Sequence, residues 1–244
     1  MRCAIIADIH ANLTAFTAVL DDIEHKGGVE EVWCLGDVVG YGPDPHQCID
    51  LLRQHNHICV AGNHDWASAG KLDTSSFNPD AVNACHWTAR QLSPEDVQYL
   101  ENLPLVSQKG DFNLVHGSPR DPVWEYLLST STAKENFNHF QSQFCLVGHS
   151  HVPLVFKHNE DGSFSGAQLL PNVGLVLDRS RLIVNPGGVG QPRDGDPQAG
   201  YAIYDSESKL IRPYRVSYDI SATQDKMVEC GLPMRLVTRL SYGI

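Results

Sequence analysis

Residues 31–40 read EVWCLGDVVG, an apolar run rich in β-forming residues that stops at Gly36 and is followed by the carboxylate of Asp37. A short apolar run that ends in glycine predicts a buried strand opening onto a loop. In open α/β sheets, groups that bind ligands lie just beyond the carboxyl ends of such strands. Gly-Asp after a strand is usually only a turn, so the significance of Asp37 depends on what the other strand ends carry.

Strands and helices alternate around this stretch. Residues 3–7 predict a strand, and Asn12 is placed to cap a helix whose apolar residues recur at helical spacing. Asp44 and Pro45 predict the start of a second helix, and residues 58–61 predict a third strand. This β-α-β-α-β order favours a parallel sheet with crossover helices.

The second half of the chain has a different pattern. Helices are expected from Pro79, from Pro94 and over residues 133–140, and strands over residues 112–115 and 144–147. Short strands without long helices between them then favour a second, more antiparallel sheet, whose outer face two late helices would cover. These strands are residues 154–156, 167–170, 182–184, 201–204 and 211–216, and the late helices are residues 223–230 and 234–240. Without a repeat or linker, residues 1–244 are interpreted as one domain.

The composition limits the function classes. The 244 residues include 29 acidic and 18 basic side chains, a formal charge of -11 that disfavours binding to a nucleic-acid polymer. It does not exclude a phosphate substrate, because bound divalent cations reverse the local sign. Seven cysteines without a CxxC pair indicate core residues in a reducing compartment. With no signal peptide and no bilayer-spanning apolar run, a cytoplasmic protein without a membrane partner is expected.

Five polar clusters occur at the ends of predicted strands, and each one alone has a structural explanation. A turn, a helix cap or a hydrogen-bonded histidine would account for any of them. Residues i and i+2 of an extended chain share a face, so each Asp/His-x-His cluster is expected to point one way. Together the clusters indicate a common cleft where the strand ends converge. They are Asp8-x-His10, Gly36-Asp37, Gly62-Asn63-His64-Asp65, His116-Gly117 and Gly148-His149-x-His151.

The residue types in these clusters point to metal chemistry. They offer carboxylate, amide and imidazole ligands without a thiolate, which suits Mn²⁺, Fe, Zn²⁺ or Ni²⁺. Seven ligands are too many for one ion but suit two ions that share a carboxylate, and we interpret Asp37 as that carboxylate. Two ions about 3.5–4 Å apart can activate a water for in-line displacement. The candidates are Asp8, His10, Asp37, Asn63, His116, His149 and His151.

The ordered set of five motifs, within roughly the first 200 residues, resembles the calcineurin-like metallophosphoesterases, in particular their small single-domain prokaryotic members. The resemblance implies an α/β fold, a four-layer α/β-β/α sandwich of two mixed β-sheets flanked by helices. It also implies that His64 meets the phosphate and protonates the leaving group, while Asp65 orients its ring. One metal would take Asp8, His10, Asp37 and His151, and the other would take Asp37, Asn63, His116 and His149.

The sequence departs from one branch of this family. Phosphoprotein phosphatases carry a phosphate-gripping arginine shortly after the second motif, where this chain has Tyr41 between two glycines. Tyr41 and Asn12 are candidate substrate contacts, with packing and capping as the alternatives. Arg120 and Arg193 are candidates for the missing positive charge, with surface salt bridges as the alternative.

We therefore expect a dimetal phosphoesterase that hydrolyses a small phosphodiester or phosphomonoester through attack of a metal-bridging hydroxide. Its cofactors would be two divalent transition-metal ions, with Mn²⁺ as first choice. A dinucleoside polyphosphate hydrolase, of the diadenosine tetraphosphate type, is the alternative. A non-catalytic scaffold is disfavoured because no ligand is missing, and a nuclease is disfavoured by the acidic balance. The oligomeric state does not follow from the sequence.

Overall fold

The computed structural model describes all 244 residues as twelve strands and eight helices. The strands are β1 (Arg2–Ile6), β2 (Glu31–Cys34), β3 (His57–Cys59), β4 (Val106–Lys109), β5 (Phe112–Val115), β6 (Phe144–Leu146), β7 (Leu154–His158), β8 (Phe164–Gln168), β9 (Leu175–Val176), β10 (Arg181–Asn185), β11 (Ala199–Asp205) and β12 (Leu210–Val216). The helices are α1 (Leu13–His25), α2 (Pro45–Arg53), α3 (Asn63–Ser68), α4 (Pro79–Ala89), α5 (Pro94–Asn102), α6 (Thr130–Asn136), α7 (Ile220–Glu229) and α8 (Met234–Arg239).

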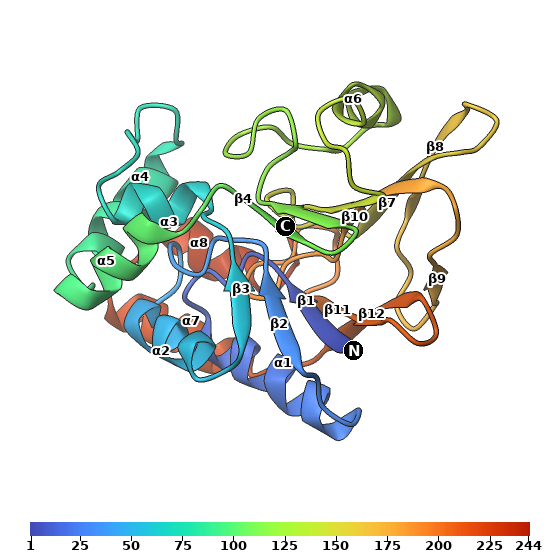
Figure 1. Ribbon diagram of the computed structural model, residues 1–244. Helices are drawn as coiled ribbons and strands as arrows, with labels where there is room; N and C mark the ends of the chain where they lie inside the picture. Colours follow the sequence, from blue (N-terminus) through green and yellow to red (C-terminus); the bar gives the residue numbers. More distant parts are fainter.

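The strands form two mixed six-stranded sheets, in the orders β3-β2-β1-β11-β12-β9 and β4-β5-β6-β10-β7-β8. In the first sheet β1, β2 and β3 pair in parallel, and in the second β5, β6 and β10 do so. Figure 1 shows α1 and α2 on one side of the paired sheets and α6 on the opposite side. The predicted four-layer α/β-β/α sandwich is confirmed.

Strand periodicity explains how the layers hold together. Successive side chains of a strand point to opposite faces. In β1, Cys3 and Ile5 pack into the core between the two sheets, whereas Ala4 and Ile6 pack into the core beneath the helices. A third core, which contains Phe137, lies between the second sheet and α6. Both faces of each sheet are therefore covered, as parallel strands require.

Sheet membership differs from the expectation for the last strands. The segments predicted at 201–204 and 211–216 form β11 and β12, which belong to the first sheet, because β11 pairs with β1. Conversely, β5 and β6 belong to the second sheet, where they are parallel neighbours. Each sheet is thus completed by strands from the other half of the chain, which a local pattern does not reveal.

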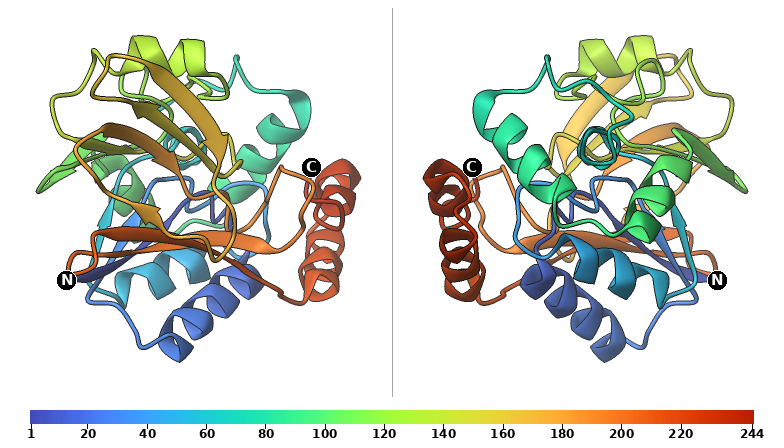
Figure 2. Two further views of the ribbon diagram at one scale, coloured as in Figure 1. Left: turned by 90° about the vertical axis from the view of Figure 1, so that its right-hand side faces the viewer. Right: turned by 90° about the vertical axis from the view of Figure 1, so that its left-hand side faces the viewer.

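The last two helices also lie elsewhere than expected. We expected them on the outer face of the second sheet, but α7 packs against α1 and α8. Met227 of α7 and Leu236 of α8 share an apolar cluster with Ala81 and Ala84 of α4. Figure 2 shows the red C-terminal helices on the same side of the molecule as α4.

The helix starts that were expected from capping residues are present in the structure. Asn12 caps α1, with its Oδ1 accepting from the Ala15 amide at 3.1 Å. Ser93 and Asp96 form the reciprocal capping box of α5.

All seven cysteines are free and six of them are buried. None of the helices combines the length and the apolar character needed to cross a bilayer.

Candidate dimetal centre

The predicted ligands meet at the carboxyl ends of strands from both sheets. Asp8 and His10 follow β1, and Asp37 follows β2. Two buried groups result, in each of which the candidate ligand atoms lie within 4.8 Å of one another. The first group is Asp8, His10 and His151, and the second is Asp37, His116 and His149.

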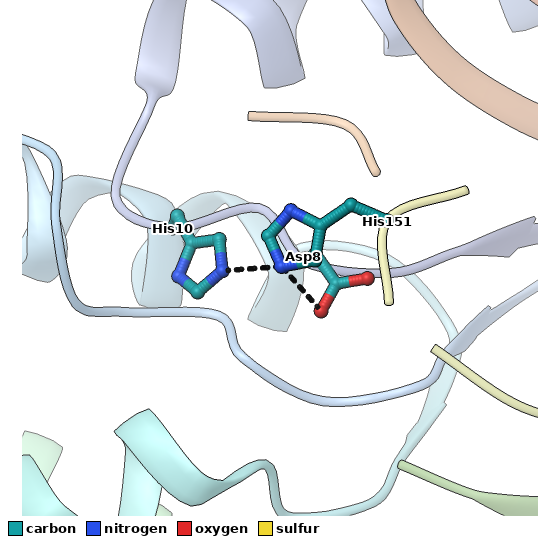
Figure 3. A group of neighbouring side chains, drawn as sticks. All are labelled: Asp8, His10 and His151. Atoms are coloured by element: carbon teal, nitrogen blue, oxygen red, sulfur yellow. Dashed lines mark hydrogen bonds and ion pairs between the residues drawn. The ribbon is translucent and has the colours of Figure 1, made fainter. Parts of the chain in front are cut away.

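The first group is compact and nearly inaccessible to solvent. The Nε2 atoms of His10 and His151 are 3.2 Å apart, and the Nε2 of His151 is 3.4 Å from Oδ1 of Asp8 (Figure 3). The other oxygen of Asp8, Oδ2, is buried without a hydrogen-bond partner. Because a buried carboxylate oxygen without a partner is costly, its place beside two imidazoles fits a metal ligand.

The second group adds the amide of Asn63. The Nε2 of His116 lies 3.1 Å from Oδ1 of Asn63 and 3.1 Å from Nδ1 of His149. Asp37 connects this group to the first, since its Oδ2 is 3.4 Å from Nε2 of His116 and 3.6 Å from Nε2 of His10. Spacings of about 3 Å between donor atoms suit metal–ligand bonds of roughly 2.1 Å. The arrangement is consistent with two metal positions that share Asp37.

Backbone carbonyls set the orientation of each imidazole. One ring nitrogen of each histidine faces a main-chain oxygen, which leaves the other nitrogen turned into the site with its lone pair. For three of the rings that inward atom is Nε2, whereas for His149 it is Nδ1. The carbonyl partners are Val39 for His10, Leu35 for His116, Trp124 for His149 and Gln191 for His151.

The loops that carry the ligands have strained backbones, and this corrects the extended geometry assumed from the spacing. Five ligand residues have left-handed φ values, which cost about 1–3 kcal/mol each in a non-glycine residue. Because the chain turns at these residues, His149 and His151 do not share a face; they lie in different groups. The φ values are 56° at Asp8, 49° at His10, 53° at Asp37, 63° at His149 and 58° at His151.

Burial and mutual charge perturb the titration of the site. Burial alone would raise the pKa of Asp37, but the surrounding imidazoles, His116 foremost, hold it well below its ordinary value. Burial and then the Asp37 charge raise the pKa of Asp8 to about 7. Burial would lower the pKa of His116, but Asp37 outweighs it and raises that pKa to about 9. One strongly ionised carboxylate thus lies at the centre of the set, as a shared ligand would.

His64 lies beside the two groups without joining either. It follows Asn63 at the start of α3, and its main-chain N–H donates to Oδ1 of Asp37 at 2.9 Å. Burial lowers the pKa of the ring to about 4. The Nδ1 atom is 3.3 Å from the thiol sulfur of Cys85 on α4. No linear motif indicates Cys85, because α4 reaches His64 only through the packing of α3 against α4.

The expectation that Asp65 orients the His64 ring is wrong. The carboxylate of Asp65 instead accepts main-chain N–H groups of Asp37 at 2.8 Å, Val39 at 3.1 Å and Gly62 at 2.9 Å. It therefore holds together the two loops that present Asp37 and Asn63. A carboxylate with three amide donors supports backbone geometry, and Asp65 is a positioning residue for these loops.

A cavity of about 120 Å³ opens over the ligands and is lined by Tyr41, His64 and Arg193. The ring of Tyr41 lies 4.2 Å from that of His64 and 5.8 Å from the guanidinium carbon of Arg193. Tyr126, on the long loop after His116, also lines the cavity and stacks on His149. Sequence reasoning identified Tyr41 and Arg193, whereas Tyr126 carries no motif and was missed.

The other two proposed substrate contacts lie away from this cavity. Arg120 forms ion pairs with Glu125 and Glu135 on the surface, which is the salt-bridge alternative. Asn12 is buried as the cap of α1 and donates from Nδ2 to the Gly190 carbonyl at 2.9 Å. The structure therefore brings neither residue to the cavity, and the capping alternative describes Asn12.

Known proteins resemble this chain along its whole length. The model of the calcineurin-like phosphoesterase superfamily domain matches residues 1–209. An uncharacterized protein of Methanocaldococcus jannaschii is 39% identical over 98% of this chain and 97% of that protein. A metallophosphoesterase structure from Sphaerobacter thermophilus, 47% identical, superposes with a TM-score of 0.90 over 100% of this chain and 99% of that one.

Two further likenesses are more limited. A Pyrococcus horikoshii protein shares the fold with a TM-score of 0.82 at 22% identity, over 100% of this chain and 98% of that one. A symmetrical bis(5'-nucleosyl)-tetraphosphatase of Haemophilus ducreyi is 28% identical over 55% of this chain, which spans 51% of that enzyme. The family match, the fold and the two buried His/Asp groups agree: the chain belongs to the metal-dependent calcineurin-like phosphoesterase superfamily.

Proposed function

We propose that this protein hydrolyses a phosphodiester or phosphomonoester at a dimetal centre. Its ligands would be Asp8, His10, Asp37 and His151 for one ion and Asp37, Asn63, His116 and His149 for the other. The observation that carries the proposal is the position of Asp37, whose Oδ2 faces a histidine of each group at 3.4 and 3.6 Å. The buried, unpartnered Oδ2 of Asp8 supports it independently.

When bound, the two ions would activate a water for in-line attack and neutralise charge on the phosphoryl oxygens. Side chains of the cavity would bind and position the phosphate. Arg193 lines the cavity and is placed to bind a phosphoryl oxygen, supported by its buried Nε without a partner. Tyr41 packs between Arg193 and His64 and limits where the phosphate sits.

His64 is the proposed acid for the leaving group. In the hydrolysis a water oxygen bonds to phosphorus, the bond from phosphorus to the leaving oxygen breaks, and that oxygen takes a proton. Because burial disfavours the charged ring, His64 would hold the transferred proton only against the negative charge of a bound phosphate. Its ring lies on the cavity wall beside both groups, which supports a role next to the departing oxygen.

A dinucleoside polyphosphate hydrolase is the second candidate. The 28% identity to a symmetrical bis(5'-nucleosyl)-tetraphosphatase favours it, although that match covers 51% of the enzyme. A non-catalytic scaffold is disfavoured because all seven ligand positions converge. Strands of both sheets contribute to one apolar core between them, which supports a single domain over residues 1–244. The free cysteines support a cytoplasmic location, and the cavity of about 120 Å³ over the ligands supports a small phosphorylated substrate.

A substrate panel tests the proposal. Purified protein would be assayed with Mn²⁺, Fe²⁺, Zn²⁺ or Ni²⁺ on bis(p-nitrophenyl) phosphate, p-nitrophenyl phosphate and diadenosine tetraphosphate. Metal-dependent release of product from at least one compound is expected, together with two bound ions per chain by elemental analysis. A single ion per chain, or no hydrolysis with any metal, would refute the proposal.

The role of His64 has its own test. General acid catalysis contributes about 10²–10⁴-fold, and an alkoxide needs this help far more than p-nitrophenolate does. His64→Ala should therefore lose much more activity on a methyl or ribose ester than on the matching p-nitrophenyl ester, with both ions retained. Equal losses on the two esters would indicate phosphoryl binding instead, and loss of one ion would make His64 a ligand.

A further inference from the structure

A second, larger cavity adjoins the catalytic one. It has a volume of about 660 Å³ and lies between α8, the residues after it and the start of α4. Asn78, which caps α4, lines both cavities. Figure 2 shows the C-terminal helices beside α4. Because the family model matches residues 1–209, the α8 wall lies outside the segment that this chain shares with the family model.

The walls of the two cavities carry positive charge in an acidic protein. Arg193 lines the catalytic cavity, and Arg235 and Arg239 of α8 line the larger one. None of these three arginines forms an ion pair with a carboxylate side chain. The arginines that do so are Arg120 and Arg215. Asp80 also lines the larger cavity, but it forms no ion pair with these arginines. Six arginines elsewhere in the chain also lack a carboxylate side-chain partner, so it is their position on the walls of the two cavities that distinguishes these three.

Two of these guanidinium groups, those of Arg193 and Arg239, have free donors. Arg193 donates from Nη2 to Oε1 of Gln191 at 2.9 Å, and its buried Nε has no partner. Arg239 donates from Nε to an oxygen of Ile244, the last residue of the sequence, where the chain as given carries a carboxylate, and its two Nη atoms have no hydrogen-bond partner. Burial, and then the charge of Arg193, lower the pKa of Arg239 to about 10. Arg193 lies over the ring of Tyr41, 5.8 Å from its centroid, and Tyr41 shares an apolar cluster with Leu236 and Val237 of the helix that carries Arg239.

We propose that Arg239, together with a donor of Arg193 that the scissile phosphate does not use, binds a second phosphate of the substrate, one that belongs to the leaving group. The scissile phosphate would lie at the metal ligands, and the group beyond the second phosphate would enter the cavity along α8. Guanidinium groups match the geometry of phosphate and bind it through charge-assisted hydrogen bonds. The exposed ring of Tyr242 and the side chain of Met234 offer the rest of that cavity an apolar wall.

The proposal names a substrate class, nucleoside polyphosphates and similar compounds with adjacent phosphates, and it rests on the proposed function. A simple phosphodiester such as bis(p-nitrophenyl) phosphate has no second phosphate and would use the catalytic cavity alone. Adenosine triphosphate would reach both cavities, whereas orthophosphate would occupy only the metal site. The ratio of their inhibition constants therefore measures what the second site contributes.

The experiment measures inhibition of bis(p-nitrophenyl) phosphate hydrolysis by adenosine triphosphate and by orthophosphate at one metal concentration. Arg239→Gln should lower the preference for adenosine triphosphate by about 10-fold, as expected for one charge-assisted hydrogen bond. Arg239→Lys, which keeps the charge, should lose less. Arg212→Gln, on the exposed side of β12 and away from both cavities, is the matched control and should keep the wild-type ratio. Chelation of metal by the nucleotide is the same for every variant and cancels in the comparison.

Calorimetric titration of adenosine triphosphate into the metal-free protein separates this proposal from the proposed function. If no substrate is hydrolysed, the proposed function fails, but weaker nucleotide binding by Arg239→Gln than by Arg212→Gln would still support the second site. An unchanged ratio and unchanged binding in Arg239→Gln would overturn it. Equal losses in Arg239→Gln and Arg212→Gln, or no nucleotide binding by the wild type in either experiment, would overturn it as well.

Discussion

Replacing Gly62 by alanine should disable the dimetal centre without altering any ligand. Gly62 has a φ of -92°, which alanine adopts freely, so the effect is purely steric. A Cβ atom there would lie 2.0 Å from Oδ1 of Asp37 and 2.4 Å from its main-chain nitrogen, whereas an ordinary contact begins at 3.4 Å. The loops cannot simply separate, because the Asp65 carboxylate accepts an N–H from both of them.

The size of the effect follows from this displacement. Moving a catalytic group by about 1 Å typically costs around 10²-fold in rate, so we expect a loss of that order in kcat. Overpacking a buried site costs about 1–3 kcal/mol, and each kcal/mol lowers Tm by roughly 2–4 °C for a chain of this size. The protein should remain folded, with weaker binding of both ions because Asp37 is the residue that moves.

The assay combines metal stoichiometry, kcat on bis(p-nitrophenyl) phosphate and Tm. Gly174→Ala is the matched control, because its Cβ would meet the side chain of Leu210 at an ordinary 3.4 Å. Circular dichroism separates a loss of the site from a loss of the fold. If Gly62→Ala bound two ions with wild-type affinity and turned over at the wild-type rate, Asp37 would not be the shared ligand in this arrangement.

Three further outcomes are expected. Asp37→Asn should be harder to restore with excess Mn²⁺ than His151→Ala, because a shared carboxylate holds both ions; equal rescue in activity titrations would contradict the bridging role. The Cys85 sulfur lies 3.3 Å from Nδ1 of His64, so Cys85→Ala should reproduce the leaving-group dependence of His64→Ala in weaker form, whereas Cys85→Ser, which keeps a hydrogen-bonding group, should not. Identical kinetics of the wild type, Cys85→Ala and Cys85→Ser would contradict a role of this contact in catalysis. Burial raises the pKa of Asp8 to about 7, so its carboxyl is mostly protonated below that pH and must release a proton to bind metal. Metal affinity measured by calorimetry should therefore rise from pH 6 to pH 8 with proton release at the lower pH, and a flat profile would contradict this protonation state.

The sequence by itself determined the parts that depend on local chemistry. Apolar runs that end in Gly36 or Gly148 predicted strands with polar groups at their carboxyl ends, and the structure has them there. Asn12 and Ser93 predicted helix starts because a capping side chain needs only the next few amides. The ligand types in their order also indicated a family, because a dimetal site demands particular donor atoms whatever the fold around them.

Only the tertiary structure decided which of these groups meet. The spacing of His149 and His151 suggested one direction, but left-handed backbone at both residues sends them to different groups. Asp65 is close to His64 in the chain, yet its carboxylate satisfies amides of the neighbouring loop, since a buried carboxylate takes the donors that the fold provides.

The same reason explains the arginines and the last strands. Arg120 and Arg193 were equally good candidates for a phosphate-binding arginine in the sequence. In the structure Arg120 forms ion pairs with Glu125 and Glu135 at the surface, whereas Arg193 lines the cavity. Likewise, β11 completes the first sheet because its unpaired backbone groups match the free edge of β1. Such choices depend on contacts between residues far apart in the chain, and a pattern of neighbouring residues contains no information about them.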